Sequence, residues 1–455
     1  MCQLLLPDFC EVVNYKENLM RSLNLRQVKF TNKADQINSD YGITIPKHYQ
    51  INTRNGADKI IGKKEISDDF GIELSVEIVE TDHVPTIFNR EFIITKEVNT
   101  DGIKNKGIIN TGNGADKITG VAKTDLSANA IIIFQALALA KTTDTAVISN
   151  LFTSVELNAT TDGIDNSYSH INTGNGKDYI SGFADASITA VAIANADISA
   201  IVDDITQTPN SENLTAFAQA ITVSIAQAKI IAKGINNTKG RISTGNDDDT
   251  ICGKATSVNS TFSETFAGTF VTATPNSQAV AEAVANAVAE TEDMAIAIDN
   301  QKGLINTGNG NDHIIAIAEA RNKAIAINNT HGLINTGNGN DTIIANATSN
   351  ESYSIFGGHI NMGNGNDQLK ASNFGGGVNI NMGNGDDFVV GFGEATLNGG
   401  SGFDILNVGT YNIEDFQINL GTNNNQVTFE LNNIIMNTIG FEQFDFANGS
   451  FNINF

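Results

Sequence analysis

The chain has few of the residues on which several protein classes depend. It has no tryptophan, five prolines, three cysteines and six histidines in 455 residues. The cysteines, Cys2, Cys10 and Cys252, show no metal-ligand spacing and form no disulfide framework. None of the histidines falls in a ligand spacing such as H-x-x-x-H, and surface positions are expected for His313 and His331. Disulfide-stabilised and histidine- or cysteine-ligated metal folds are therefore excluded.

Positive charge and long apolar stretches are scarce as well. The chain carries 27 basic and 51 acidic residues, a net charge of −24, which disfavours nucleic acid and anionic membranes as partners. No run of 18 apolar residues suggests a membrane span. Residues 1–12 lack a basic n-region, so no secretory signal peptide is expected there. No GxSxG, P-loop or nucleotide-binding motif is present, and we expect no enzyme.

One short unit is abundant and recurs nine times. Between Ile305 and Ile314 it reads INTGNGNDHI, and it returns between Ile334 and Ile343 almost unchanged. Each copy consists of an apolar residue, a loop usually rich in Gly and Asn, an aspartate and a second apolar residue two positions later. The nine aspartates are Asp58, Asp116, Asp178, Asp249, Asp312, Asp341, Asp367, Asp387 and Asp404.

The residue types of this unit favour a cation-binding loop. Glycine permits left-handed backbone angles and close approach of carbonyl groups, and asparagine tolerates the same angles. A loop that offers only carbonyl and carboxylate oxygens suits a hard cation, and a flexible one suits Ca²⁺ better than Mg²⁺. The candidate ligands are the nine aspartates together with the loop glycines Gly112, Gly114, Gly174, Gly176, Gly308, Gly310, Gly337, Gly339, Gly363, Gly365, Gly383, Gly385, Gly400 and Gly402.

The spacing of the aspartates predicts a coiled sheet. Successive steps are 58, 62, 71, 63, 29, 26, 20 and 17 residues. The last steps approach 18, a length that fits a flattened coil of two short strands and two turns. The four long steps are close to twice the steps of 29 and 26, which predicts an additional rung without a recognisable loop inside each.

The units resemble the hemolysin-type (RTX) calcium-binding nonapeptide G-G-x-G-x-D-x-U-x. Residues 399–407, GGSGFDILN, carry the full pattern. Other copies have Thr (Thr111, Thr307, Thr336) or Met (Met362, Met382) at the first glycine. Two copies depart further, at Arg54 and at Asp247.

The resemblance implies a parallel β-roll with several Ca²⁺ ions between loops stacked along one edge. It also implies export by type I secretion, read from an uncleaved C-terminal segment, and hence an extracellular or cell-surface location.

A second interpretation needs no metal. Parallel solenoids stack asparagines into hydrogen-bonded ladders, and the column from Asn52 to Asn398 fits such a ladder. The two interpretations are compatible. Carboxylates about 4.8 Å apart repel by about 1 kcal/mol in water and about 3–4 kcal/mol at an effective dielectric constant of 20. Cations would remove that repulsion, and their binding would then favour folding.

The predicted fold class is all-β, a parallel β-roll or β-solenoid in four parts. Residues 1–50 form an N-terminal cap with a short helix near residues 14–23. Residues 51–300 form an irregular solenoid with long rungs, residues 301–406 a compact RTX-like roll, and residues 407–455 a β-rich cap that also carries the possible secretion segment.

The Ala-rich spacers are the ambiguous part of this prediction. Alternation over residues 71–79 and 187–194 predicts strands. In Ala279 to Glu290 the valines recur every four residues, as in a helix, whereas alanine alternates with other residues, as in a strand. Neighbouring stretches on both sides of Arg321 alternate plainly, and we therefore expect strand. Asparagines that precede Gly240, Gly303 and Gly332 predict the second turn of each rung. These turns lack an aspartate in the loop register, so calcium is expected along one edge only.

Three classes of function remain. The first is a secreted or surface-associated structural module that requires calcium, with an unknown cell-surface or matrix partner. The second is a calcium-dependent enzyme or accessory region, because similar repeats adjoin catalytic domains, including cyanobacterial alkylating enzymes. The third is an ice- or polysaccharide-binding face formed by an outward row of asparagines: Asn113, Asn175, Asn309, Asn338, Asn364 and Asn384, with Asn311, Asn340 and Asn366 beside it.

Overall fold

The computed structural model of the chain is almost entirely strand. In the part that it describes there is no α-helix, and a 3₁₀ turn spans Ile413–Asp415. No helix there is long and apolar enough to cross a membrane. The helix expected near residues 14–23 lies almost wholly outside the described part. The structure describes residues 10–13, 22–24, 32–81, 86–141, 143–202, 214–273, 278–421 and 425–453.

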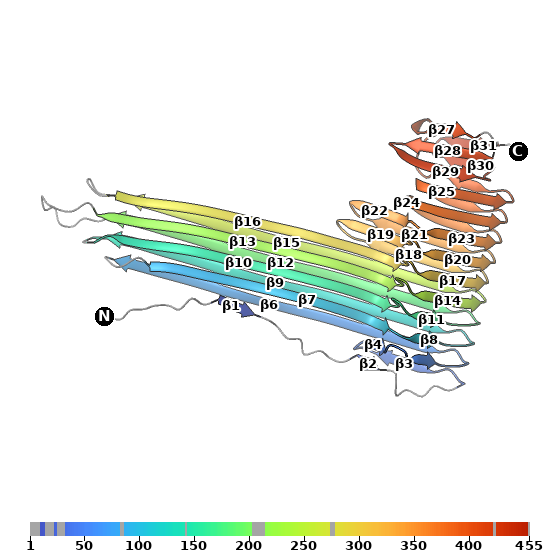
Figure 1. The fold of residues 1–455 in the computed structure, drawn as a ribbon, viewed down its shortest axis with the longest axis horizontal. Coiled ribbons are helices and arrows are strands. Elements are labelled where there is room, and N and C mark those ends of the chain that lie inside the picture. The colour runs from blue at the N-terminus through green and yellow to red at the C-terminus, as the bar shows by residue number, and fades with distance from the viewer. Residues whose placement is uncertain are drawn as a thin grey trace.

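The chain coils into one parallel solenoid, which confirms the predicted fold class (Figure 1). Each strand pairs in parallel with the equivalent strand of the next rung, so identical motif positions lie above one another. Strands that lead into the loop edge show this most plainly, since isoleucines at one register position are buried in every rung. These strands are β5 (Gln50–Asn52), β8 (Ile108–Asn110), β11 (His170–Asn172), β14 (Arg241–Asn246), β17 (Leu304–Asn309), β20 (Leu333–Asn338) and β23 (His359–Asn364).

Four rungs extend far to one side of the loop edge as two facing sheets, which we call the wing (Figure 1). The outgoing strand β9 pairs along its length with β6 on one side and β12 on the other. No additional rung lies between them, so the prediction of a hidden rung inside each long step is wrong. The extra residues instead lengthen two strands of a single rung. The outgoing strands are β6 (Lys59–Thr81), β9 (Lys117–Ala140), β12 (Tyr179–Val202) and β15 (Thr250–Thr272); the returning strands are β7 (Thr86–Asn105), β10 (Thr145–Asp165), β13 (Thr215–Asn236) and β16 (Gln278–Asp299).

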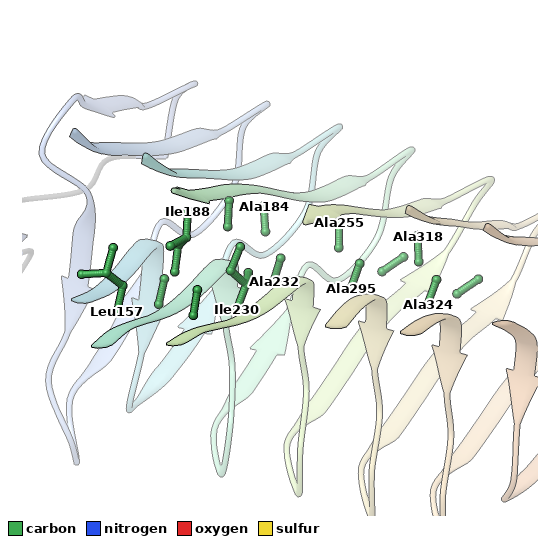
Figure 2. Close-up of a cluster of buried hydrophobic side chains, with 14 of the residues drawn as sticks. Leu157, Ala184, Ile188, Ile230, Ala232, Ala255, Ala295, Ala318 and Ala324 are labelled. Carbon is green, nitrogen blue, oxygen red and sulfur yellow. The ribbon is translucent and has the colours of Figure 1, made fainter. Parts of the chain in front are cut away.

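The alternating spacers predicted as strands are strands in the structure. Residues 71–79 lie in β6, 187–194 in β12 and 279–290 in β16, so the helical alternative for the Ala-Val stretch is wrong. The stretch forms a strand because its alanines recur at every second position, and in a strand these positions all face the opposite sheet. Figure 2 shows such small side chains facing one another, with Ala184 and Ala255 on one sheet and Ala232 and Ala295 on the other.

Side chains inside the wing become smaller from the first long rung to the last. In the first rungs aromatic residues fill the space, and the rings of Phe88 and Phe134 stack with their centroids 4.3 Å apart. In the last rung the register puts Ala267 of β15 at the position of Phe134 and Ala283 of β16 at that of Phe88. The half-buried residues Thr261, Ser263 and Thr265 lie on the same interior face of β15. The wing therefore ends in a rung whose interior side chains are small and mostly polar. It has no counterpart to the stacked rings of Phe88 and Phe134.

The wing joins the loop edge through a narrow waist. A Cβ on Gly120 would lie 2.0 Å from the carbonyl oxygen of Gly163, and one on Gly182 would lie 2.0 Å from that of Gly234. The outgoing and returning strands therefore approach so closely that only glycine fits there.

The rungs become short after Asp299. The rungs of 29 and 26 residues contain three strands each. The first adds β18 (His313–Glu319) and β19 (Lys323–Asn328) to β17; the second adds β21 (Thr342–Thr348) and β22 (Glu351–Phe356) to β20. Buried Asp293 fixes the first short turn, because its carboxylate accepts the N–H groups of Arg321 at 2.8 Å and of Asn322 at 3.1 Å.

Both ends of the solenoid are covered by additional strands. At the start, β3 (Gln36–Ser39) and β4 (Ile43–Ile45) pair with β6 and β7, and β1 (Cys10–Val13) pairs with the outer part of β7. The expected β-rich C-terminal cap is confirmed. Following β24 (Gln368–Asn384), β25 (Phe388–Ser401) and β26 (Ile405–Asn407), the cap consists of β27 (Gln417–Leu420), β28 (Gln426–Leu431), β29 (Ile434–Ile439), β30 (Gln443–Phe446) and β31 (Gly449–Asn452).

Candidate functional site

The structure brings all nine predicted aspartates together in one column at the loop edge. Each is at most 2 % exposed. The backbone N–H of each aspartate donates to Oδ1 of the aspartate in the next rung, over 2.7–2.9 Å from Asp58 to Asp404. A parallel, in-register ladder produces this repetition, because every rung places the same side chain in the same position.

The column is longer at both ends than the sequence motif indicates. The N–H of Asp35 donates to Oδ1 of Asp58 at 2.8 Å, and the N–H of Asp404 donates to Oε2 of Glu442 at 2.7 Å. Strand pairing puts both residues in register, since Ile37 pairs with Ile60 and Leu406 with Phe444. Both units show the pattern of an acidic residue followed two positions later by an apolar one. Asp35 has none of the loop glycines, and Glu442 has one of them, Gly440, two positions before it.

The predicted loop glycines adopt the angles that the motif requires. In the loops of the compact rungs φ lies between +102° and +135°. A Cβ on Gly337 would lie 1.9 Å from the carbonyl oxygen of Gly308 in the preceding rung, so the loops stack in direct contact. Arg54 and Asp247, where the motif departs, also have positive φ, 77° and 76°. The backbone thus keeps the loop shape even where the residue is unfavourable for it.

One oxygen of most column aspartates has no partner. The buried Oδ2 atom is unpaired at Asp116, Asp178, Asp249, Asp312, Asp341, Asp367, Asp387 and Asp404. Threonine hydroxyls lie beside them, yet those of Thr173 and Thr307 donate to carbonyl oxygens of the next rung, at 3.4 and 3.0 Å. Most rungs therefore present an acceptor that lacks a donor inside a crowded column of like charges; at Asp58 the hydroxyl of Thr53 donates to Oδ2.

Burial makes these carboxylates costly to ionise. It raises the pKa of Asp116, Asp341 and Asp387 to about 6, and neighbouring hydrogen bonds lower it only in part. Burial raises the pKa to about 7 at Asp178, Asp249, Asp367 and Asp404, where adjacent carboxylates add to the effect. An unpaired buried carboxylate is stabilised by a proton or a cation.

The residues of the column fit a hard cation. Neighbouring strands lie about 4.8 Å apart, and calcium binds oxygen at about 2.3–2.6 Å. An ion between two rungs could therefore reach the free Oδ2 atoms of both. Carboxylates, backbone carbonyls and side-chain amides make up most of this edge, with His313 and the buried thioethers of Met362 and Met382 as exceptions. Such oxygen ligands suit a hard cation better than a transition metal.

Asparagine ladders accompany the column and coexist with the unpaired oxygens. The predicted inner ladder is confirmed between Asn110 and Asn172 and from Asn306 to Asn398, and it is interrupted at Ser243. In the inner ladder Asn361 donates to Asn335 and Asn381 to Asn361, at 2.7 and 2.8 Å. The expected outward row is also present and exposed, with Asn364 donating to Asn338 at 2.5 Å. Side-chain amides thus bind rung to rung on both sides of the aspartates.

A third asparagine ladder, which the sequence analysis did not recognise, lies buried at the second turn of the rungs. Asn105, Asn166, Asn237, Asn300 and Asn329 are 0 % exposed, and the Nδ2 of each of the first four donates to Oδ1 of the next at 2.7 Å. Each Nδ2 also donates to a backbone carbonyl, at 3.2 Å from Asn237 to Leu304. The sequence showed these asparagines as turn residues, and only their burial reveals the ladder.

Replacing Asn237 by alanine tests how much this buried ladder contributes to the stability of the fold. The change removes the acceptor of Asn166 and leaves Oδ1 of Asn300 and the carbonyl of Leu304 without this donor, all in a buried site. We expect the free energy of unfolding to fall by about 3 kcal/mol, measured by urea denaturation. The matched control is Asn309→Ala in the exposed ladder, for which a loss of at most about 1 kcal/mol is expected. Equal losses of stability in the two variants would contradict a larger contribution from the buried ladder than from the exposed one.

A separate acidic cluster lies at the second turn, away from the column. Oxygen atoms of Asp101, Asp162 and Asp165 lie within 4.8 Å of one another. Lys104 already binds this cluster, with its Nζ 2.5 Å from Asp101 and 3.8 Å from Asp165. Burial raises the pKa of Asp162 to about 7, although the charge of Lys233 opposes this. Because lysines supply the positive charge here, the cluster is an ion-pair network.

Known proteins do not add to this picture. No protein-family model, no curated protein and no solved structure matches the chain. The functional argument therefore depends on the geometry of the column itself.

Proposed function

We propose that the protein is a calcium-binding β-roll of the RTX type, a secreted or surface-associated structural module whose folding depends on calcium. The observation that carries the proposal is the column of stacked aspartates, each buried and most with an unpaired Oδ2. The motif at residues 399–407 supports the family assignment.

Calcium would supply the positive charge that the column lacks. In this proposal the aspartates provide carboxylate oxygens, and the loop glycines provide a backbone shape that no other residue allows without strain. The asparagine ladders hold successive loops in register in the folded chain, so the carboxylates of adjacent rungs face a common ion. The surrounding backbone excludes most water from the column, which strengthens the attraction between an ion and its ligands.

A structural role also fits the distribution of the remaining residues. The net charge of −24 keeps the chain away from anionic surfaces unless cations bind. Extracellular calcium modules bind with dissociation constants of about 10⁻⁴–10⁻³ M, and we propose an affinity in that range for a module that folds on export.

Calorimetric titration of the chelated protein with calcium tests this function. We expect several ions to bind and the melting temperature to rise, because ligands that bind only the folded state stabilise it. Circular dichroism in EDTA should show less β-structure than in calcium. Magnesium is the matched control and should bind more weakly, because it requires a smaller and more regular site. A melting temperature and spectrum that are the same in EDTA and in calcium would contradict the proposal.

A further inference from the structure

The last long rung leaves two strand edges open. Strand β18 pairs with β15 only as far as Thr256, and β19 pairs with β16 only from Met294 onward. Residues 257–272 of β15 and 278–293 of β16 therefore have no neighbouring strand on that side in the described part of the chain. Neither stretch contains Lys, Arg or Pro, which often protect edge strands. Their exposed carboxylates, Glu264, Glu282, Glu290 and Glu292, point outward, and the one buried carboxylate, Asp293, lies at the base and is hydrogen-bonded to the adjacent turn. Two adjacent edges of about 50 Å thus present unpaired backbone groups.

The opposite edge of the wing is protected. There β6 has Asp68 in register with buried Leu126, which places a charge among the interior positions. Glu73 and Glu77 stand on its outer face, and β1 covers the outer part of β7. Inward charges and a covering strand are the devices that prevent edge-to-edge association. Within the described residues the β15–β16 edge is therefore the one without such protection, so the wing does not favour open-ended stacking of copies.

The outward side chains of β15 are symmetric about Phe266. Phe262, Phe266 and Phe270 are 49 %, 53 % and 60 % exposed and lie four residues apart. If a second β15 pairs antiparallel about Phe266, Phe262 faces Phe270 of the copy and Phe266 faces its equivalent. Glu264 then faces Gly268, so the acidic side chain meets no like charge.

The outward side chains of β16 are symmetric about Val284. Val280, Val284 and Val288 again lie four residues apart, with Glu282 and Asn286 between them. Antiparallel pairing about Val284 puts Val280 opposite Val288 and Glu282 opposite Asn286. Like charges directly opposite each other would destabilise such a pairing, and this register avoids them.

Both centres of symmetry lie on one line through the wing. The hydroxyls of Ser263 in β15 and Ser224 in β13 are 2.6 Å apart, and Ser224 pairs with Ala287 of β16. Nδ2 of Asn259 donates at 2.8 Å to the carbonyl of Ala228, which pairs with Thr291. Position 263 therefore faces 287, and 259 faces 291. Because β15 and β16 run in opposite directions, three residues beyond Ser263 in β15 correspond to three residues before Ala287 in β16. Phe266 therefore lies opposite Val284.

We propose that the β15–β16 edge is a dimer interface occupied by a second copy of this chain. One two-fold axis through Phe266 and Val284 pairs β15 with β15 and β16 with β16, both antiparallel. The two sheets of the wing continue across the interface, and the open backbone groups of both edges are paired. The contact is isologous, so it closes after two copies and forms no filament.

Sedimentation of the full-length protein in calcium tests the assembly. We expect a species of twice 48.3 kDa. Phe266→Lys places two positive charges opposite each other on the axis, and Val284→Lys does the same in the other sheet; each is expected to raise the dissociation constant at least 100-fold. Val79→Lys is the matched control, because Val79 is 60 % exposed on the protected β6 strand. A monomer at 100 µM, or a dimer insensitive to both variants, would overturn the proposal.

Cysteine cross-linking tests the register independently of affinity. Directly opposed residues on antiparallel strands have Cα atoms about 4.5–5.5 Å apart, within the range that a disulfide requires. With the three native cysteines replaced by serine, Phe266→Cys is expected to form a covalent dimer on oxidation. Phe262→Cys faces position 270 and should not cross-link to itself. Cross-linking at 262 but not at 266, or larger oligomers, would overturn the two-fold arrangement.

Discussion

Replacing Gly337 by alanine is expected to lower the free energy of unfolding by about 3–6 kcal/mol. Gly337 has a φ of +105°, and an added Cβ would lie 1.9 Å from the carbonyl oxygen of Gly308. The side chain would therefore push apart two rungs that are held in register by the aspartate column and two asparagine ladders. Urea denaturation in calcium measures the loss.

Gly377 provides the matched control. Its φ is +64°, yet an added Cβ would meet nothing within 4 Å. Gly377→Ala is expected to cost about 1–2 kcal/mol, the strain of a left-handed residue without a clash. The difference between the variants isolates the contact between stacked loops. If the two substitutions cost the same, close loop stacking does not contribute to stability.

The features that repeat in the sequence were the ones that could be predicted from it. The loop motif fixes which residues lie above one another, so the alignment of Asp58 to Asp404 and the ladder from Asn306 to Asn398 followed from spacing alone. Alternation with a period of two identified the strands, including the Ala-Val stretch of β16. The loop motif and the alternation are both local features of the sequence. In a parallel, in-register coil, equivalent residues of successive rungs lie above one another, so these local features determine the columns directly.

The length of the rungs could not be predicted in the same way. The steps of 58 to 71 residues were close to twice the short ones, and arithmetic alone does not distinguish two rungs from one rung with long strands. Pairing of β9 with β6 and β12 decides the question, and pairing is a tertiary property. The ends of the column were missed because Asp35 keeps the register with no loop glycine and Glu442 keeps it with Gly440 alone.

The buried asparagine ladder and the open edge were hidden for a related reason. Asn237 has the sequence signature of a turn residue, and nothing local shows that its side chain is 0 % exposed. The spacing of Phe262, Phe266 and Phe270 was present in the sequence. This spacing indicates an interface only once the structure shows that β18 stops pairing with β15 at Thr256. Edge strands and central strands show the same alternation of residue types, so the sequence does not reveal which strand edge is exposed.

The sharpest test of the calcium proposal is a pair of substitutions whose effect changes sign with the ion. Asp341→Asn and Asp367→Asn keep the Oδ1 acceptors for the N–H groups of Asp312 and Asp341. They remove two negative charges from adjacent rungs. In EDTA the double variant should be more stable than the parent by about 2 kcal/mol, because repulsion between neighbouring carboxylates is relieved.

In calcium the same double variant should be less stable and should bind fewer ions, because two charged ligands are lost. Asp197→Asn, an exposed carboxylate on the wing, is the control and should change neither quantity. If the column were only a hydrogen-bonded ladder, asparagine would serve as well as aspartate in both buffers. Stabilisation in EDTA together with an equal gain in calcium would therefore favour the ladder alone. Opposite signs in the two buffers require an ion that uses these carboxylates, since hydrogen bonding between rungs is the same in both.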